Sequence, residues 1–307
     1  MRTRALQPYA PGASVRERFA CEDAYEMEVL HCAPSSGSPE RPPLVFVHGS
    51  YHAAWVWDVF FHRYFAERGY DCYALSLRGQ GSSDPVSGPV GGTLRSHARD
   101  VADFCRKRLD GRAPVLVGHS FGGLVVQEYV MHAAGEGSAA ASGDVYPALS
   151  GLVLLNTVPP SGNQGMIGRF LRKDFLKSAR ITWAFISKSF LKSSDTCKEL
   201  FFSETMPEPD VRRYMELLEN SSQVRLLDLR RLSEDVPLPR PPPGAPPVLV
   251  VGGADDNVVD LEAVEETGAH FQRSTTVVLE GVAHDSMIDV RWEDTAKAVE
   301  EWLAALR

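Results

Sequence analysis

The chain has 307 residues and a formal net charge of −8, with 44% hydrophobic and 23% charged residues. The acidic balance argues against nucleic acid as a partner, because phosphate binding needs a basic surface. No apolar run approaches the ~20 residues that cross a bilayer, and the start of the chain lacks the charged-then-apolar pattern of a secretory signal. We therefore expect a soluble intracellular protein, cytoplasmic or plastid and not secreted, with one core and an appended subdomain.

The cysteines and histidines indicate the redox compartment and whether a metal site is expected. The cysteines are Cys21, Cys32, Cys72, Cys105 and Cys197. Their odd number and the lack of C-x-x-C spacing predict buried free thiols in a reducing compartment, although Cys21 and Cys32 could face each other across an N-terminal hairpin. The nine histidines form no metal-binding set, so we expect no metal and no cofactor.

Strand and helix patterns alternate along the chain. Alternation of polar and apolar residues over 15–20 and 25–32 predicts an antiparallel edge pair. Core strands are predicted at 44–47, 71–77, 114–117, 152–155, 247–251 and 276–279. Helices are predicted at 57–67, 94–109, 121–131, 261–269 and 292–306, and an Ala/Gly/Ser-rich surface insertion at 133–142. This alternation predicts an α/β fold with a mostly parallel sheet covered by helices on both faces.

Residues 159–236 interrupt this rhythm, because they carry helical patterns but no convincing strand. A proline-rich linker, 237–244, closes the segment. We expect a helical cap at 159–236 between two parts of the core, 1–158 and 237–307. Within it, residues 166–192 combine seven basic residues and one acid with interleaved apolar ones. Three interpretations stay open: the apolar face covers a pocket, a basic amphipathic helix makes peripheral contact with an anionic membrane, or the basic residues recognise an anionic substrate.

The stretch Gly118-His119-Ser120-Phe121-Gly122 joins a predicted strand to a predicted helix. A G-x-S-x-G turn in that context is a nucleophile elbow, which lifts the serine hydroxyl above the sheet. A serine hydroxyl becomes a good nucleophile only when an adjacent base takes its proton and a third group orients that base. Ser120 is therefore the candidate nucleophile.

The base is expected downstream of Ser120, where the chain has three histidines. His132 lies on the helix that follows the elbow, about three turns away, and His270 ends a helical run. His284 instead follows a short apolar strand, in a loop where residues from different strands can converge. His284 is the candidate base.

The acid is expected at the end of a strand between the nucleophile and the base. The loop after strand 247–251 carries two adjacent carboxylates, Asp255 and Asp256. The loop after strand 152–155 offers Asn156 and no carboxylate. The residues alone do not decide whether Asp255 or Asp256 is the acid.

An oxyanion hole needs two N–H donors beside the nucleophile. The strand 44–47 runs into His48-Gly49-Ser50. The residue after a strand-ending His-Gly supplies one backbone N–H and the residue after the nucleophile supplies the other, which gives Ser50 and Phe121. Losing one such donor costs on the order of 100- to 1000-fold in rate.

A substrate pocket is expected between the His-Gly loop and the cap. The candidate lining residues are His48, His52, Trp55 and Trp183. The bulky apolar side chains in this set favour a small hydrophobic ester as the substrate, although each tryptophan could equally belong to the core.

These motifs resemble the α/β-hydrolase superfamily over nearly the whole chain. The segment 75–83 is similar to the family's D-x-R-G-x-G-x-S turn, with Ser76 where many members carry aspartate. The loop 48–57 looks like the oxyanion loop of plant-type esterases and hydroxynitrile lyases. The chain as a whole resembles plant and algal hydrolases that include chlorophyll-dephytylating esterases. The resemblance implies an α/β-hydrolase fold and favours Asp256, three residues after Gly253, as the acid.

The expected function is therefore serine hydrolysis of a carboxylic ester with a hydrophobic acyl or alcohol part, through an acyl-enzyme on Ser120. A lyase or a C–C hydrolase could use the same triad, since fold does not fix chemistry. A ligand-sensing protein with a vestigial triad is a further alternative. Dehalogenases and epoxide hydrolases of this fold are disfavoured, because they need a carboxylate at the position of Ser120.

Overall fold

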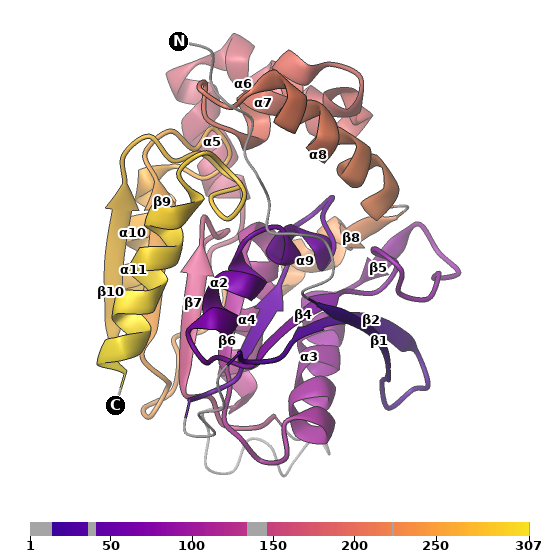
Figure 1. Cartoon of the computed structure of the whole chain (residues 1–307). Helices are drawn as coiled ribbons and strands as arrows, with labels where there is room; N and C mark the ends of the chain where they lie inside the picture. The colour runs from indigo at the N-terminus through magenta and orange to yellow at the C-terminus, as the bar shows by residue number, and fades with distance from the viewer. Residues whose placement is uncertain (1–13, 36–40, 134–145, 223, 307) are drawn as a thin grey trace.

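A computed structural model describes residues 14–35, 41–133, 146–222 and 224–306. Eight strands form one sheet in the order β1-β2-β4-β3-β6-β7-β9-β10 (Figure 1). The strands are β1 Val15–Ala20, β2 Glu26–Cys32, β3 Leu44–Val47, β4 Cys72–Ser76, β6 Val115–His119, β7 Gly151–Leu155, β9 Val248–Gly253 and β10 Ser274–Leu279. β2 pairs antiparallel with β1 and β4, and all other neighbours are parallel. The predicted edge pair, core strands and α/β-hydrolase fold are confirmed.

Helices cover both faces of this sheet. One layer consists of α3 Leu94–Arg108, α4 Ser120–Ala133 and α10 Leu261–His270, and the other of α1 Trp55–Asp58, α2 Phe61–Glu67 and α11 Trp292–Ala305. Side chains alternate along the strands, so that Phe46 packs in one core and its neighbours Val45 and Val47 pack in the other. Among the described helices, none is both long and apolar enough to span a membrane.

The single helix predicted at 57–67 is two helices, because Phe60 departs from helical geometry with φ −138°. The insertion predicted at 133–142 lies outside the described residues from 134 onward.

Among the described residues, five α-helices are inserted between β7 and β9: α5 Gln164–Lys173, α6 Phe175–Ser187, α7 Ser194–Phe201, α8 Glu208–Ser221 and α9 Leu229–Asp235. We refer to them as the inserted helices. The first four gather beyond the carboxyl ends of the parallel strands, at the top of Figure 1. The same segment holds a strand, β8 Arg225–Leu227, which pairs in parallel with β5 Val90–Gly92. The prediction that no strand lies between 159 and 236 was wrong, because three residues are too few to show an alternating pattern.

The turn after β4 receives a carboxylate from another strand. Ser76 Oγ donates a hydrogen bond to Glu28 Oε2 at 2.6 Å, and the Ser82 N–H donates to the same oxygen at 2.9 Å. Ser76 Oγ also accepts the Ala54 N–H at 2.9 Å. Glu28 on β2 and Ser76 together therefore provide side-chain acceptors for this turn.

All five cysteines are buried and free, as the sequence predicted. Cys32 and Cys72 are register partners on β2 and β4. Burial raises the pKa of the Cys105 thiol to about 12. These thiols therefore stay protonated and act as small core residues.

Candidate active site

Ser120 lies at the junction of β6 and α4, with φ +52°. Residues other than glycine rarely adopt this conformation, and it costs of order 1–3 kcal/mol unless the surroundings enforce it. The surroundings are tight here: a β-carbon at Gly122 would lie 2.3 Å from the His48 carbonyl oxygen, and one at Gly118 would lie 2.6 Å from Gly123 Cα. Backbone atoms cannot yield easily, so the glycines are required for the turn that presents Ser120.

His284 and Asp256 form a buried pair on the loops that follow β10 and β9. The distance between His284 Nδ1 and Asp256 Oδ2 is 2.8 Å. Burial by itself lowers the pKa of His284, but the carboxylates of Asp256 and Asp285 outweigh burial, so this pKa lies above its ordinary value. An imidazole whose protonated form is stabilised in this way is suited to accept a proton.

Asp256 is held on both of its carboxylate oxygens. Its Oδ1 accepts the backbone N–H groups of Val258 and Val259 at 2.7 and 2.9 Å. Its Oδ2 accepts Asn156 Nδ2 at 2.9 Å, in addition to His284. Asp255, in contrast, is exposed. Of the two candidate acids, the structure therefore brings only Asp256 to His284.

Ser120 and His284 line the same cavity, which has a volume of about 520 Å³. The two candidate oxyanion residues, Ser50 and Phe121, line it as well. Much of its remaining wall is apolar and comes from α5 and α6, with Met166, Ile167, Phe170, Ile181, Phe185 and Ile186. A cavity of this size with such apolar walls suits a ligand that has an apolar part.

His48 does not line this cavity and instead supports its wall. Its Nε2 accepts the Leu77 N–H at 3.0 Å, so its Nδ1 carries the proton and donates to the Gly49 carbonyl at 2.8 Å. Burial lowers the pKa of His48 to about 3, which keeps the ring neutral. Because Gly49 C=O and Ser50 N–H belong to one planar peptide, His48 fixes the direction of the Ser50 N–H.

The other predicted pocket residues also lie elsewhere. His52 is fully buried, with Nδ1 2.8 Å from the Ser50 carbonyl oxygen and Nε2 2.8 Å from Asp285 Oδ2. Trp55 donates its Nε1–H to Ser221 Oγ at 2.6 Å and packs against the core. Trp183 is 65% exposed on α6. None of the four predicted pocket residues, His48, His52, Trp55 and Trp183, is among the residues that line this cavity, because sequence spacing does not show which way each side chain points.

Three buried groups, of which only His52 was a predicted site residue, lie beside the pair. The ligand atoms of His52, His119 and Asp285 lie within 4.8 Å of one another, which is close enough to hold a metal ion. His119 Nε2, however, lies 3.0 Å from the His284 carbonyl oxygen, and both nitrogens of His52 face protein acceptors. The cluster therefore links the loops of Ser50, Ser120 and His284 to one another.

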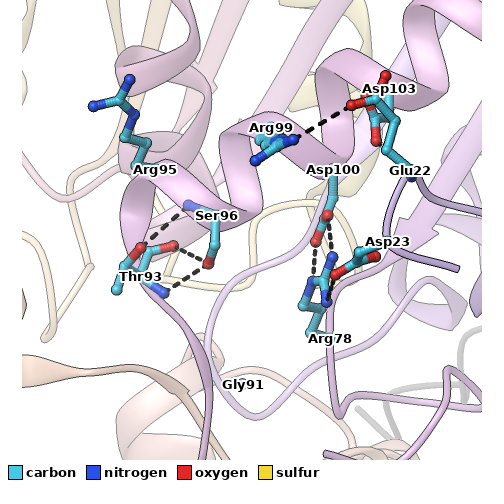
Figure 2. A pocket seen from close by; sticks show the side chains of 10 residues that line it. All are labelled: Glu22, Asp23, Arg78, Gly91, Thr93, Arg95, Ser96, Arg99, Asp100 and Asp103. Carbon is cyan, nitrogen blue, oxygen red and sulfur yellow. Dashed lines mark hydrogen bonds and ion pairs between the residues drawn. The ribbon is translucent and has the colours of Figure 1, made fainter. Parts of the chain in front are cut away.

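A second cavity, of about 420 Å³, lies beside the N-terminal half of α3. Figure 2 shows Arg78 between two acids in this cavity. Arg78 Nε lies 2.5 Å from Asp100 Oδ2, and Nη1 lies 2.8 Å from Asp23 Oδ2. These carboxylates raise the pKa of Arg78 above its ordinary value. Arg78 is therefore held by ion pairs on two sides, and the described residues that line this cavity include no candidate nucleophile paired with a base.

Residues 44–298 match the sequence model of the "Alpha/beta hydrolase family". One curated protein, a multifunctional-autoprocessing repeats-in-toxin from Vibrio cholerae, is 30% identical over 132 residues, or 41% of this chain. The match spans only 3% of that protein's length.

Solved structures with the same fold cover nearly the whole chain. A hydrolase from Pseudomonas aeruginosa PA01 has a TM-score of 0.65 and 21% identity, covering 96% of this chain and 99% of its own. An esterase, RhEst1 from Rhodococcus sp., has a TM-score of 0.59 and 18% identity, covering 95% and 99%. A putative non-heme bromoperoxidase, BpoC from Mycobacterium tuberculosis, has a TM-score of 0.64 and 19% identity, covering 92% and 96%. At these identities the likeness establishes the fold.

Proposed function

Because the chain belongs to the alpha/beta hydrolase family, we propose that it is a serine hydrolase of carboxylic esters with a hydrophobic acyl or alcohol part. Similar structures include both an esterase and a bromoperoxidase, so the fold alone leaves the reaction open. One observation supports the proposal most strongly: His284, paired with Asp256, lines the same apolar cavity as Ser120.

In the proposed mechanism, His284 takes the proton of the Ser120 hydroxyl as its oxygen attacks the ester carbonyl. Asp256 keeps the proton of the imidazole on Nδ1 and stabilises the charged ring. The N–H groups of Ser50 and Phe121 receive the negative charge of the tetrahedral intermediate. His284 then protonates the leaving alcohol, and water repeats the sequence on the acyl-enzyme.

The function is tested with p-nitrophenyl esters of increasing acyl length. We expect hydrolysis that improves from short to medium chains, because the walls from α5 and α6 are apolar. A fluorophosphonate probe should label Ser120. Labelling would distinguish an enzyme with a reactive serine from a ligand-sensing protein with an inactive one. Cleavage of cyanohydrins without any ester hydrolysis would instead indicate a lyase, and failure of both labelling and turnover would refute the proposal.

The resemblance to chlorophyll-dephytylating esterases suggests a narrower substrate class, the phytyl esters. A phytyl ester has a long apolar alcohol part, which suits the same cavity walls. Release of phytol from chlorophyll at a rate comparable to the best p-nitrophenyl ester would support this narrower class. Hydrolysis of small esters alone would leave the serine esterase proposal standing and reject the phytyl ester.

We also propose that α6 brings the protein to an anionic membrane surface. Four of its apolar side chains are largely exposed: Phe175, Leu176, Trp183 and Ile186. Exposed cations in and near α6 accompany them, namely Arg172, Lys173 and Lys192, together with Arg180, which pairs with Glu199. Ile186 also lines the cavity, so the exposed apolar surface adjoins the entrance to the proposed site. This combination favours a lipid surface, which accepts apolar side chains and attracts cations.

Sedimentation with vesicles tests this contact. We expect binding to phosphatidylcholine vesicles that contain phosphatidylserine and much less binding to vesicles without it. Trp183→Gln and Lys173→Met should each weaken binding. Leu261→Gln serves as the control, because Leu261 is 43% exposed but lies on α10. Equal sedimentation with and without acidic lipid would exclude the membrane contact.

A further inference from the structure

The cavity that contains Ser120 and His284 also carries two cationic side chains, Lys188 and Arg225. None of the described residues that line it is an aspartate or a glutamate. An apolar cavity with cations and without carboxylates at its wall has a positive potential, because low-dielectric walls concentrate the field of the charges. The wall is therefore complementary to a ligand that has both an apolar part and a negative charge.

Lys188 is placed at the cavity by an unusual backbone conformation. It ends α6 with φ +53° and ψ +32°, in the left-handed region. Glycine usually occupies this position at the end of a helix, because a side chain there is disfavoured. Lysine is therefore unusual at this position, and here its side chain lines the cavity.

The ammonium group of Lys188 has contacts that leave its charge uncompensated. Its Nζ donates to the Ser222 carbonyl at 2.9 Å and lies 5.9 Å from the centre of the Tyr51 ring. Both Ser222 and Tyr51 line the cavity, and neither is anionic. Burial lowers the pKa of Lys188, and an anion at this point would restore the pKa by stabilising the charged form.

Two further cations reinforce this potential. Arg225, on the short strand β8, is exposed at the same cavity wall. Lys177 Nζ donates to Asn257 Oδ1 at 2.8 Å, and Asn257 lines the cavity. The positive charge thus comes from α6 and from β8, which lie far apart in sequence.

We propose that the ester cleaved at Ser120 carries an anionic group, a carboxylate or a phosphate, which Lys188 and Arg225 bind. This inference rests on the proposed ester hydrolysis. The apolar walls from α5 and α6 hold the chain of the substrate, the ester lies at Ser120, and the anion pairs with the two cations. Charge-assisted hydrogen bonds of this kind add both affinity and orientation.

The kinetic test compares esters that differ only in charge. p-Nitrophenyl esters with a terminal carboxylate are compared with neutral esters of equal chain length, over several lengths. We expect Lys188→Met and Arg225→Gln each to lower kcat/KM for the charged esters about 10-fold and to leave the neutral esters unchanged. Lys107→Met is the matched control, because Lys107 is an exposed cation on α3 outside the cavity wall. Equal effects on charged and neutral esters would overturn the proposal.

A phosphate arm distinguishes the two anions. Hexanoate release from dihexanoylphosphatidate is compared with release from dihexanoylglycerol, in the wild-type protein and in both variants. If the wild-type protein prefers the charged substrate only in the phosphatidate pair, the anionic group is a phosphate. If it prefers the charged substrate only among the p-nitrophenyl esters, the anionic group is a carboxylate.

Folding defects are controlled with Lys188→Gly. This variant removes the charge while it relieves the left-handed backbone, so it should fold at least as well as the wild type. It should lose the preference for charged esters as Lys188→Met does. Retention of the preference in both variants would refute the role of Lys188.

A binding measurement separates this inference from the proposed function. Calorimetry with Ser120→Ala measures the affinity for decanoate, decyl phosphate and decanol, and needs no turnover. If the protein cleaves no ester but binds an anion about 10-fold more tightly than decanol in a Lys188-dependent way, the anion site stands and the hydrolase proposal fails. If esters are cleaved but the three ligands bind alike, the anion site fails and the hydrolase proposal stands.

Discussion

His284 and Asp256 contact each other across two loops, with His284 Nδ1 2.8 Å from Asp256 Oδ2. The other oxygen of Asp256 accepts the N–H groups of Val258 and Val259, so the carboxylate cannot turn away from the ring. This arrangement keeps a proton on Nδ1 and leaves Nε2 as the nitrogen that can accept one. This geometry therefore predicts how activity depends on pH and on substitutions at the site.

Activity should rise with pH through a pKa above the ordinary histidine value of about 6.5. His284 must be neutral to take the proton of Ser120, and its pKa is raised by Asp256 and Asp285 against the lowering effect of burial. In Asp256→Asn the burial of His284 remains while the attraction of the Asp256 carboxylate is lost, so the pKa of His284 should fall. The rise of kcat/KM with pH should then occur at lower pH. The maximal rate should also fall roughly 10⁴-fold, because the ring adopts the wrong tautomer. The measurement is kcat/KM against pH; an acid limb that does not move in Asp256→Asn would contradict the assignment.

Ser120→Ala should lower kcat by roughly 10⁴-fold or more and leave substrate binding intact, because only the nucleophilic oxygen is lost. The variant should also lose labelling by a fluorophosphonate. Ser178→Ala is a suitable comparison, since Ser178 lines the same cavity without being part of the proposed machinery. Retention of most of the activity in Ser120→Ala would refute the nucleophile assignment.

The positions of Ser120 and His284 could be predicted because each follows a strand whose apolar run is visible in the sequence. All parallel strands end at one edge of the sheet, so the loops after β6 and β10 must converge there. The choice of Asp256 over Asp255 needed either a family resemblance or coordinates, because adjacent carboxylates differ only in the direction of their side chains.

Other contacts between distant segments, which no sequence motif marks, could not be predicted. Glu28 supports the turn beside Ser76 from a neighbouring strand, and no local pattern indicates that they meet. The tryptophans and histidines assigned to the pocket illustrate the same limit. Lys188 and Arg225 reach the cavity from α6 and β8, and both elements are positioned only by their packing on the core.

Acid should destabilise the protein through His48. Its folded pKa is lowered to about 3 by burial, whereas the unfolded residue titrates near the ordinary value of 6.5. Below pH 6.5 the unfolded chain therefore binds the extra proton, and stability is lost progressively as pH falls towards 3. The loss is about 1.4 kcal/mol per pH unit, or roughly 2 kcal/mol at pH 5.

Denaturant unfolding at pH 7.5 and pH 5.0 measures this effect. His48→Gln, which keeps a donor and an acceptor but does not titrate, should reduce the difference in stability between the two pH values. It should also lower kcat, because the Gly49–Ser50 peptide is held less firmly. An unchanged pH dependence in His48→Gln would show that other groups dominate acid unfolding.

Two glycine substitutions should have opposite effects on stability. In Gly122→Ala the new β-carbon would lie 2.3 Å from the His48 carbonyl oxygen and 2.6 Å from the Val47 carbonyl oxygen. The loop after β3 and the helix α4 must then separate, which we expect to cost about 3 kcal/mol and to abolish activity by displacing Ser50 from Ser120. Gly168→Ala lies in α5 and meets no atom within 4 Å. Since alanine favours a helix over glycine, this variant should gain about 0.5–1 kcal/mol. Urea unfolding and ester hydrolysis check both; equal stability of the two variants would mean that the close packing of α4 against the loop after β3 does not hold Ser120 in place.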